Sequence, residues 1–347
     1  MKRLIPLIVL TACMLSPATG SAAADNGLGD LGLNYANADS KNSNLTIDQL
    51  TAAASKGKAQ MQYELGMRYI SGNGVPQNYQ DAIRWLRKAA DQRCAPALNR
   101  LGVCYEKGLG VPKNPKTAVS FYRKAANLGD ADGQISLGTC YLNGVGLKKN
   151  PSQAVLWFRK AANQGSMMGQ TLLAACYENG TGVPQSAKDA MSWYGLAANR
   201  FAASKGDKEN YSVKDAWSDS KTPAEKDQEK DHKKRWENII EKSMRCNLGF
   251  PPAQNKLGEF YFEGKGTAKN PDQAAFWFFA AAIKGFPPAQ NKLGECFLSG
   301  QGAPEDKQAA IFWFRKAAER GYAPAKANLE AAESGAASEA ASEAGQQ

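Results

Sequence analysis

The chain has 347 residues, a length typical of about two domains. Its 43 lysines and arginines outnumber its 33 aspartates and glutamates, which gives a formal net charge of +10 at pH 7. A basic excess of this size fits contact with nucleic acid or with an anionic membrane surface, but the charges are scattered along the chain, which favours solvated helix faces.

Residues 1–24 have the pattern of an export signal. Two basic residues precede an apolar run over residues 4–15, and three alanines at 22–24 form a small-residue cleavage site. A second interpretation is that Cys13, which ends a Leu-Thr-Ala-Cys sequence similar to a bacterial lipobox, is lipidated and becomes the first residue. The sequence therefore predicts a periplasmic protein of a Gram-negative bacterium or, alternatively, one anchored to the outer membrane through Cys13 alone.

The next segment is expected to lead into an ordered helix. Residues 25–44 are rich in Asn, Asp, Gly and Ser and are predicted to form a flexible leader. Thr46 and Gln49 have the spacing of a capping box, which predicts a helix that runs to about Ser55. Its alanines are in phase with the second half of the repeats that follow, so this helix is expected to cap them.

The strongest pattern in the chain is a repeat of 36 residues that begins with a Leu-Gly pair, or with Leu-Ala in one copy. The copies begin at Leu65, Leu101, Leu137, Leu173, Leu257 and Leu293. A fixed period in this range is typical of a stacked array of small units. We therefore predict an all-α fold, an α/α solenoid of helix-turn-helix repeats, with four copies and the capping helix in residues 45–199 and two copies in residues 250–329.

Each copy has the residues of two helices joined by a tight turn. Glycines stand seven and nine positions after the Leu and are expected to end the first helix, and an Asn, Ser or Asp at thirteen is expected to cap the second. Alanine at seventeen is expected to let the helices pack closely, while an aromatic ring at twenty is expected to fill the space between repeats. Truncation of one such Trp to Ala should cost roughly 3–5 kcal/mol.

Two segments depart from the repeat. The step from Leu173 to Leu257 is 84 residues instead of 36, which places 48 additional residues in the segment 200–249. This segment is interpreted either as a degenerate repeat with a long loop or as a charged functional insertion that projects from the array. A helix is expected from about residue 222 to 246, and its apolar face, formed by Trp236, Ile239, Ile240 and Met244, is expected to pack on the array. Residues 330–347, rich in Ala, Ser and Glu, are predicted to be disordered.

The repeat resembles the Sel1-like repeat (SLR) family, which is related to the tetratricopeptide repeats. The family pattern is Leu-Gly-x-x-Tyr-x-x-Gly-x-Gly-Val, later followed by Trp-Tyr/Phe-x-Lys-Ala-Ala. Residues 101–111 read Leu-Gly-Val-Cys-Tyr-Glu-Lys-Gly-Leu-Gly-Val, and residues 121–126 read Phe-Tyr-Arg-Lys-Ala-Ala. The resemblance covers residues 59–199 and 250–329, and it implies a right-handed superhelix that serves as a scaffold without enzymatic activity. Exported members of the family include immunity proteins that neutralise effectors, such as lipases, delivered by type VI secretion.

The residues that usually carry chemistry are few. The single histidine, His232, is expected on an exposed helix, and the Cys and His residues lack the spacing of a zinc site. The sequence therefore predicts no catalytic residue, no metal and no cofactor. Four cysteines share the position three after the Leu and are predicted to be buried and unpaired, because equivalent helices lie too far apart for a disulfide. They are Cys104, Cys140, Cys176 and Cys296.

The partner-binding surface is expected on the first helix of each pair, because tetratricopeptide-like arrays present these helices along the inner, concave face. The residues two, five and six positions after the Leu are expected to face outward there. The candidate binding residues are Met67, Ile70, Val103, Glu106, Lys107, Leu142, Asn143, Glu178, Asn179, Glu259, Phe262, Glu263 and Leu298. This mixture of apolar and charged side chains favours a protein partner over a nucleic acid.

The sequence thus predicts an exported, non-enzymatic repeat scaffold that binds a protein partner on its concave face. One specific role, given by the family resemblance, is that of an immunity protein that neutralises a secreted antibacterial effector such as a lipase. The alternative is an envelope-tethered structural protein or a cell-wall-associated adaptor lipoprotein, whose basic surface contacts anionic polymer or lipid.

Overall fold

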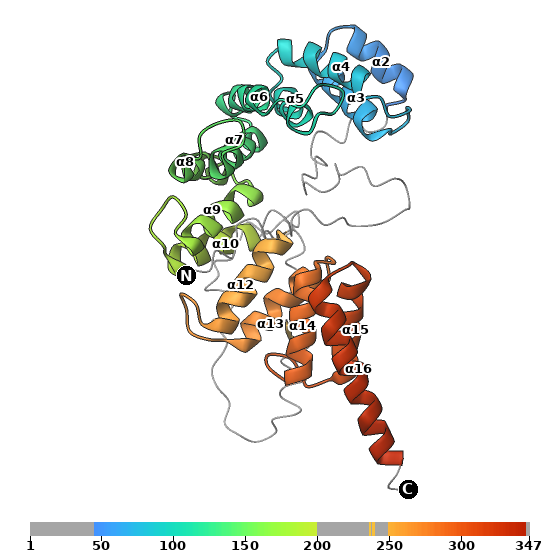
Figure 1. The fold of residues 1–347 in the computed structure, drawn as a ribbon, viewed down its shortest axis with the longest axis vertical. Helices are drawn as coiled ribbons and strands as arrows, with labels where there is room; N and C mark the ends of the chain where they lie inside the picture. Colours follow the sequence, from blue (N-terminus) through green and yellow to red (C-terminus); the bar gives the residue numbers. More distant parts are fainter. Residues whose placement is uncertain (1–44, 200–235, 237, 240–248, 345–347) are drawn as a thin grey trace. The chain divides into compact units, whose positions relative to one another are not determined.

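A computed structural model of the chain describes residues 45–199, 236, 238–239 and 249–344. This part contains 14 α-helices in consecutive packed pairs and no strand, which confirms the predicted all-α array of helix-turn-helix repeats (Figure 1). The export segment 1–24 with Cys13, the leader 25–44, His232 and most of the segment 200–249 lie outside the described residues.

The described chain forms two compact units, which divide between Gln185 and Ser186. The first unit contains α2 (Ile47–Ser55), α3 (Ala59–Ser71), α4 (Tyr79–Asp91), α5 (Ala95–Lys107), α6 (Pro115–Asn127), α7 (Ala131–Asn143), α8 (Pro151–Asn163) and α9 (Met167–Asn179). The second contains α10 (Ala187–Ala198), α12 (Pro251–Glu263), α13 (Pro271–Ala282), α14 (Pro287–Ser299), α15 (Lys307–Glu319) and α16 (Ala323–Ala344).

The helices begin and end at the residues that the sequence indicates. Thr46 and Gln49 form the predicted capping box of α2, and this helix packs on α3 with Leu50 and Ala54 fully buried. Asn150 accepts a hydrogen bond from the backbone N–H of Gln153 at 3.1 Å, which begins α8. First helices end at the first glycine of each Gly-x-Gly turn, in the left-handed conformation that glycine adopts without strain.

The second glycine of the turn allows neighbouring repeats to lie close together. Gly182 has a φ of 76°, and a Cβ there would lie 2.5 Å from the carbonyl carbon of Pro151 and 2.8 Å from the backbone nitrogen of Ser152. These two residues begin α8, the second helix of the preceding repeat. Any side chain at this glycine would therefore push the two repeats apart.

The sequence prediction placed the core ring one residue too early. The rings twenty positions after the Leu are only half-buried in five copies, and Trp277 is the buried exception. The next residue along is buried in every copy: Leu86, Tyr122, Phe158, Tyr194, Phe278 and Phe314. A shift of one residue turns a helical side chain by about 100°, so only one of these two adjacent side chains can face the first helix.

The predicted disorder of residues 330–347 is wrong for most of this segment, because α16 continues to Ala344. Alanine and glutamate are strong helix formers. The start of this helix is also held by tertiary contacts: α16 packs on α15, Ala332 is buried, and Arg315 pairs with Glu333 at 2.7 Å. Helix propensity and this packing together outweigh the polar composition of the tail.

The segment 200–249 leaves the stacking of the repeats uninterrupted. Gln254 donates a hydrogen bond to the carbonyl of Ala198 at 3.3 Å, and the backbone N–H of Phe250 donates to Ala197 at 3.0 Å. The bond from Gln254 joins the same repeat positions as the bond from Gln134 to Ala126, which are only eight residues apart at an ordinary junction. Helix α12 therefore packs on α10 as if the additional residues were absent.

Trp236 and Ile239, which belong to the predicted apolar face of that segment, are described, and Trp236 packs on α13 and α14 as predicted. Trp236 makes edge contacts with Phe279 on α13 and Phe297 on α14, with ring centroids 5.7 and 5.0 Å apart. Ile239 is buried as well. Ile240 and Met244 lie outside the described residues.

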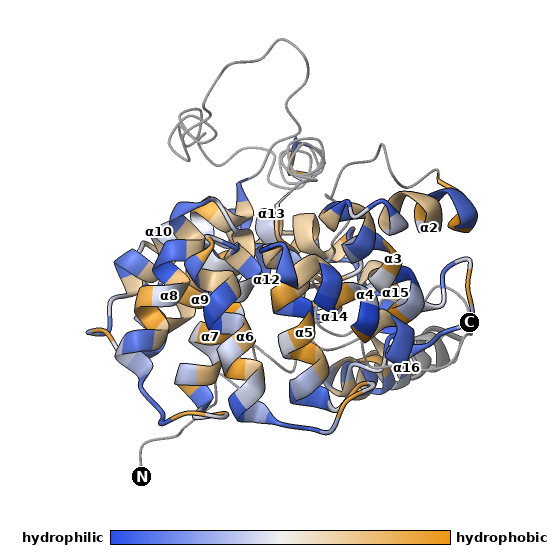
Figure 2. Ribbon diagram, turned by 90° about the horizontal axis from the view of Figure 1, so that it is seen from above, coloured by the Kyte–Doolittle hydropathy of each residue, from blue (hydrophilic) through white to orange (hydrophobic). Residues whose placement is uncertain are grey.

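Hydrophobic and hydrophilic residues alternate along most of the helices, as the mixed colours of Figure 2 show. This is the pattern of helices with one face in a protein core and the other in water. Among the described residues, none of the helices combines the length and the hydropathy that a membrane span requires.

Candidate protein-binding surface

The first helices of the repeats lie close to one another within the first unit. Helix α5 contacts α7, and α7 contacts α9, more extensively than consecutive second helices contact each other. Such an arrangement is expected where the first helices line the inner side of the stack. The predicted binding residues all lie on these first helices, α3, α5, α7, α9, α12 and α14.

Three of the apolar candidate binding residues are core residues, which corrects the sequence prediction. Ile70 and Val103 are each only 3% exposed, and Leu142 is 6% exposed. Positions two and five after the Leu lie at the edge of the helix interface, where burial of an apolar side chain contributes roughly 25 cal/mol per Å². These three side chains turn into the interface and are unavailable to a partner.

The other apolar candidates remain accessible. Leu298 is 43% exposed, and Met67 and Phe262 are half-buried. The ring of Phe262 lies 6.4 Å from that of Phe278, with the ammonium of Lys269 5.5 Å away. These residues give the first helices exposed apolar surface beside charge, which suits contact with another protein.

Polar candidates on the same helices are partly held by neighbours. Glu106 accepts a hydrogen bond from the hydroxyl of Tyr122 at 2.5 Å, and Asn179 donates to the carbonyl of Ala175 at 2.9 Å. Glu259 accepts from Asn255 and from Lys256, both at 2.8 Å. Such internal bonds fix these side chains in place, so a partner would meet a preorganised polar surface. Glu178 is half-buried, and Lys107, Asn143 and Glu263 are exposed.

The buried cysteines provide no reactive centre. Burial raises the pKa of Cys104 to about 11 and the pKa of Cys140, Cys176 and Cys296 to about 12. At neutral pH these thiols are protonated and therefore poor nucleophiles. All four are free and buried, which confirms their prediction as core residues. Within the described residues, no group of three His, Cys, Asp or Glu side chains is placed to hold a metal ion.

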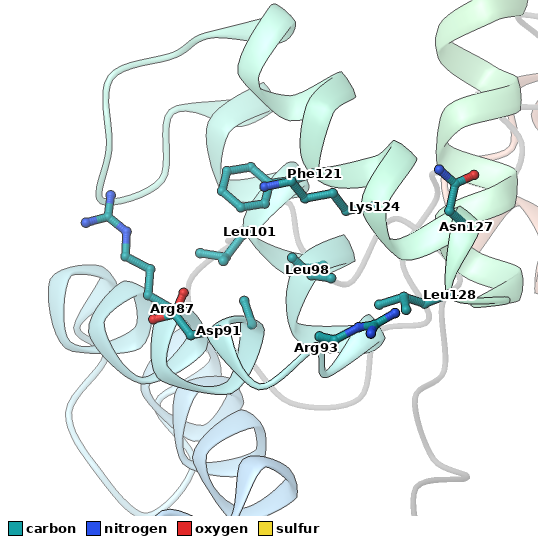
Figure 3. Close-up of a pocket in the computed structure, with 10 residues that line it drawn as sticks. Arg87, Asp91, Arg93, Leu98, Leu101, Phe121, Lys124, Asn127 and Leu128 are labelled. Atoms are coloured by element: carbon teal, nitrogen blue, oxygen red, sulfur yellow. The ribbon is translucent and has the colours of Figure 1, made fainter.

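A concave feature that the sequence prediction missed lies between α4, α5 and α6. This groove has a volume of about 680 Å³, and its lining combines apolar and cationic side chains (Figure 3). The residues that distinguish it from other junctions are Arg93, Leu98 and Leu128. Their departure from the repeat pattern is visible in the sequence, because Arg93 replaces a glycine and Leu98 a glutamine that most other copies share, and Leu128 stands where the other copies have Gln, Lys or Arg.

Comparison with known proteins agrees with the repeat architecture. The family model described as Sel1 repeat matches the chain at residues 59–94, 95–130, 131–166, 168–200, 251–286 and 287–322. The crystal structure of a Sel1 repeat protein from Oxalobacter formigenes is 26% identical, with a TM-score of 0.57, over 77% of this chain and 86% of that protein. No curated protein matches the sequence.

Two further solved structures are similar to this chain at lower TM-scores. The protein c5321, a protective antigen of uropathogenic Escherichia coli strains with an SLR fold, is 30% identical, with a TM-score of 0.46, over 82% of this chain and 59% of that protein. Immunity protein Pa5087 from Pseudomonas aeruginosa is 18% identical, with a TM-score of 0.43, over 77% of this chain and 83% of that protein.

Proposed function

Because the chain belongs to the Sel1 repeat family, whose members bind protein partners, we propose that it is an exported scaffold that binds a protein through the first helices of its repeats. The observation that carries this proposal is the accessible apolar surface of those helices: half-buried Phe262 lies on α12 together with the charged residues Glu259 and Glu263, and Leu298 is 43% exposed on α14. A buried core of apolar contacts with a polar rim is the usual composition of a protein interface.

The site of action that we propose is the periplasm. The support is the pattern of residues 1–24, with a basic start, an apolar run and a small-residue cleavage site. The buried state of the four core cysteines is compatible with an oxidising compartment, because protonated and inaccessible thiols resist disulfide exchange. Metabolic labelling with palmitate separates cleavage from lipidation, since only an anchored protein incorporates label, and Cys13→Ala abolishes it.

The specific role that we propose is neutralisation of an antibacterial effector, such as a lipase delivered by type VI secretion. An immunity protein must cover its target with a rigid, preformed surface, and a stack of helix pairs with internally bonded polar side chains provides one. The envelope-tethered adaptor is the second candidate, and it is favoured only if Cys13 carries lipid.

Capture from a periplasmic extract tests the binding role. The tagged mature protein is immobilised at physiological salt, and retained proteins are identified by mass spectrometry. We expect a stoichiometric partner that survives washing, and co-expression of the chain should protect a susceptible cell from that partner if it is a toxin. Recovery of the bait alone, from extracts of cells grown with and without competitors, contradicts the proposal.

A further inference from the structure

The groove between α4, α5 and α6 lies on the side of the second helices, apart from the predicted binding residues. Leu98 and Leu101 are buried at its floor, Leu128 is 37% exposed, and the ring of Phe121 is half-buried (Figure 3). Three cations and one carboxylate also line it: Arg87, Arg93, Lys124 and Asp91. The groove is therefore apolar at its base and positively charged around it.

One of these cations is held in an unfavourable backbone conformation. Among the described residues, Arg93 is the only one other than glycine with a positive φ, at 62°. The equivalent residue of the other helix connections is a glycine with a φ between 79° and 90°: Gly57, Gly129, Gly165, Gly285 and Gly321. A side chain in this region is strained, and such strain in proteins concentrates at functional positions.

The apolar base also departs from the repeat. In the junctions on either side, two glutamines thirty residues apart form a hydrogen bond, at 2.7 Å between Gln92 and Gln62 and at 2.8 Å between Gln164 and Gln134. In the groove the same two positions are occupied by Leu98 and Leu128. A polar bridge has thus been replaced by a leucine pair, one member of which remains exposed.

The chain itself shows that an additional apolar side chain can pack beside a repeat junction, at a site that shares one position, that of Arg87, with the groove. In the second unit, Trp236 packs against Phe279 and Phe297. These phenylalanines occupy the repeat positions that hold Arg87 and Tyr105 in the first unit, where Arg87 donates a hydrogen bond to the Tyr105 hydroxyl at 2.9 Å. At this repeat position the groove therefore has the cation of Arg87, where the Trp236 site has the ring of Phe279.

We infer that this groove binds a segment of a protein partner in which a bulky apolar side chain is adjacent to carboxylates. The apolar side chain packs against Leu98, Leu128 and Phe121, and the carboxylates pair with the surrounding cations, where guanidinium groups form strong charge-assisted hydrogen bonds. With three cations against one carboxylate, the lining selects an acidic segment over a basic one. The inference rests on the proposed function, since it gives the partner a second point of contact.

The repeat supplies variants that remove the groove while restoring the pattern of its neighbours. Leu98→Gln with Leu128→Gln recreates the glutamine bridge, and Arg93→Gly recreates the glycine of the connection. Both are expected to fold at least as well as the wild type, which thermal unfolding by circular dichroism checks. Lys124→Ala removes a groove cation, and Lys160→Ala removes the equivalent cation one repeat further on as a matched charge control.

The probe is a random library of 12-residue peptides displayed on phage and selected on the immobilised mature protein. We expect enrichment of peptides that combine Leu, Phe or Trp with Asp or Glu. Fluorescence anisotropy of a selected peptide should show affinity at least roughly tenfold weaker for the double leucine variant and for Arg93→Gly, weaker binding for Lys124→Ala, and no change for Lys160→Ala.

Three outcomes overturn the inference. The first is that the library gives no enriched peptide. The second is that the affinity of the selected peptides is unchanged by the groove variants and falls with Leu298→Asp, which would show that the scaffold binds them elsewhere. A dimer in sedimentation that the double leucine variant converts to a monomer would assign the groove to a second copy of the chain. Because the selection needs neither export nor the natural partner, its failure is distinct from a failed capture from periplasmic extract.

Discussion

Gly138 on α7 lies directly against the ring of Phe158 on α8: a Cβ on Gly138 would stand 2.6 Å from Cε1 of that ring and 2.8 Å from Cδ1. The same relationship joins Gly258 to Phe278, where the closest distance is also 2.6 Å. The glycine of each Leu-Gly pair therefore provides the space in which the core side chain of the second helix packs, which is Leu86 in the first copy and an aromatic ring in the others.

Substitution of this glycine should destabilise the fold. Gly138→Ala forces a methyl group into the Phe158 ring, and overpacking of this kind costs about 1–3 kcal/mol despite the better helix propensity of alanine. Gly195→Ala is the matched control, because Gly195 is also helical but has nothing within 4 Å of an added Cβ. Chemical denaturation should show Gly195→Ala as neutral or more stable. Equal effects of both substitutions would contradict the packing role.

The adjacent rings Trp157 and Phe158 should differ in their contribution to stability. Phe158 is fully buried whereas Trp157 is half-buried, so Phe158→Ala should lower the free energy of unfolding by about 3–5 kcal/mol and Trp157→Ala by clearly less. Urea denaturation followed by far-ultraviolet circular dichroism measures both. A larger loss of stability for Trp157→Ala than for Phe158→Ala would contradict this prediction and support the sequence-based assignment of Trp157 as the core ring.

Sequence alone was sufficient for the repeat, its capping residues and its turns, because these depend on local backbone requirements of Asn, Pro and Gly. It could not decide which of two adjacent rings faces the core, since Trp157 and Phe158 are both large and apolar. For the same reason Ile70 and Leu142 were assigned to the surface: at an interface edge, an apolar side chain can turn either way. The tail was misjudged because composition says nothing of the packing of α16 on α15.

Part of the groove is predictable from the repeats themselves. An alignment of the copies places Arg93 among glycines and Leu98 among glutamines. The sequence does not show that Arg93 and Leu98 line one groove together with Leu128, which is thirty or more positions further along the chain.

Asp130 should make stability depend on pH. Burial raises the pKa of this carboxyl from 3.8 to about 6, although the side chain also accepts a hydrogen bond from Gly133 at 2.7 Å as the cap of α7. Between these pH values the folded chain keeps a proton that the unfolded chain has lost. The contribution of Asp130 is therefore present at low pH and is lost as the pH rises through about 6.

Asp130→Asn tests this dependence, because asparagine retains an oxygen that can cap the helix but has no titrating group. Denaturation at several pH values should show the variant gaining stability relative to the wild type from pH 4 to pH 7. Parallel stability curves for the two proteins over that range would show that the carboxyl titrates normally in the folded state.

The core cysteines should not react with thiol reagents in the folded protein. Burial raises the pKa of Cys140, Cys176 and Cys296 to about 12, so we expect no labelling by maleimide at pH 7 until a denaturant unfolds the chain. Peptide mass spectrometry after labelling with and without guanidinium identifies each site, and half-buried Cys94 serves as the internal reference. Rapid labelling of a core cysteine under native conditions would indicate that its repeat opens readily.

The most direct test of the binding account is partner capture by surface variants. Phe262→Asp with Leu298→Asp places charge on the first-helix surface. Leu156→Asp is the control, because Leu156 lies on the second helix α8 and its exposure of 48% is similar to the 43% of Leu298. We predict that wild type and Leu156→Asp retain the same partner from periplasmic extract, and that the double variant, folded by circular dichroism, loses it. Undiminished capture by the double variant would contradict the account.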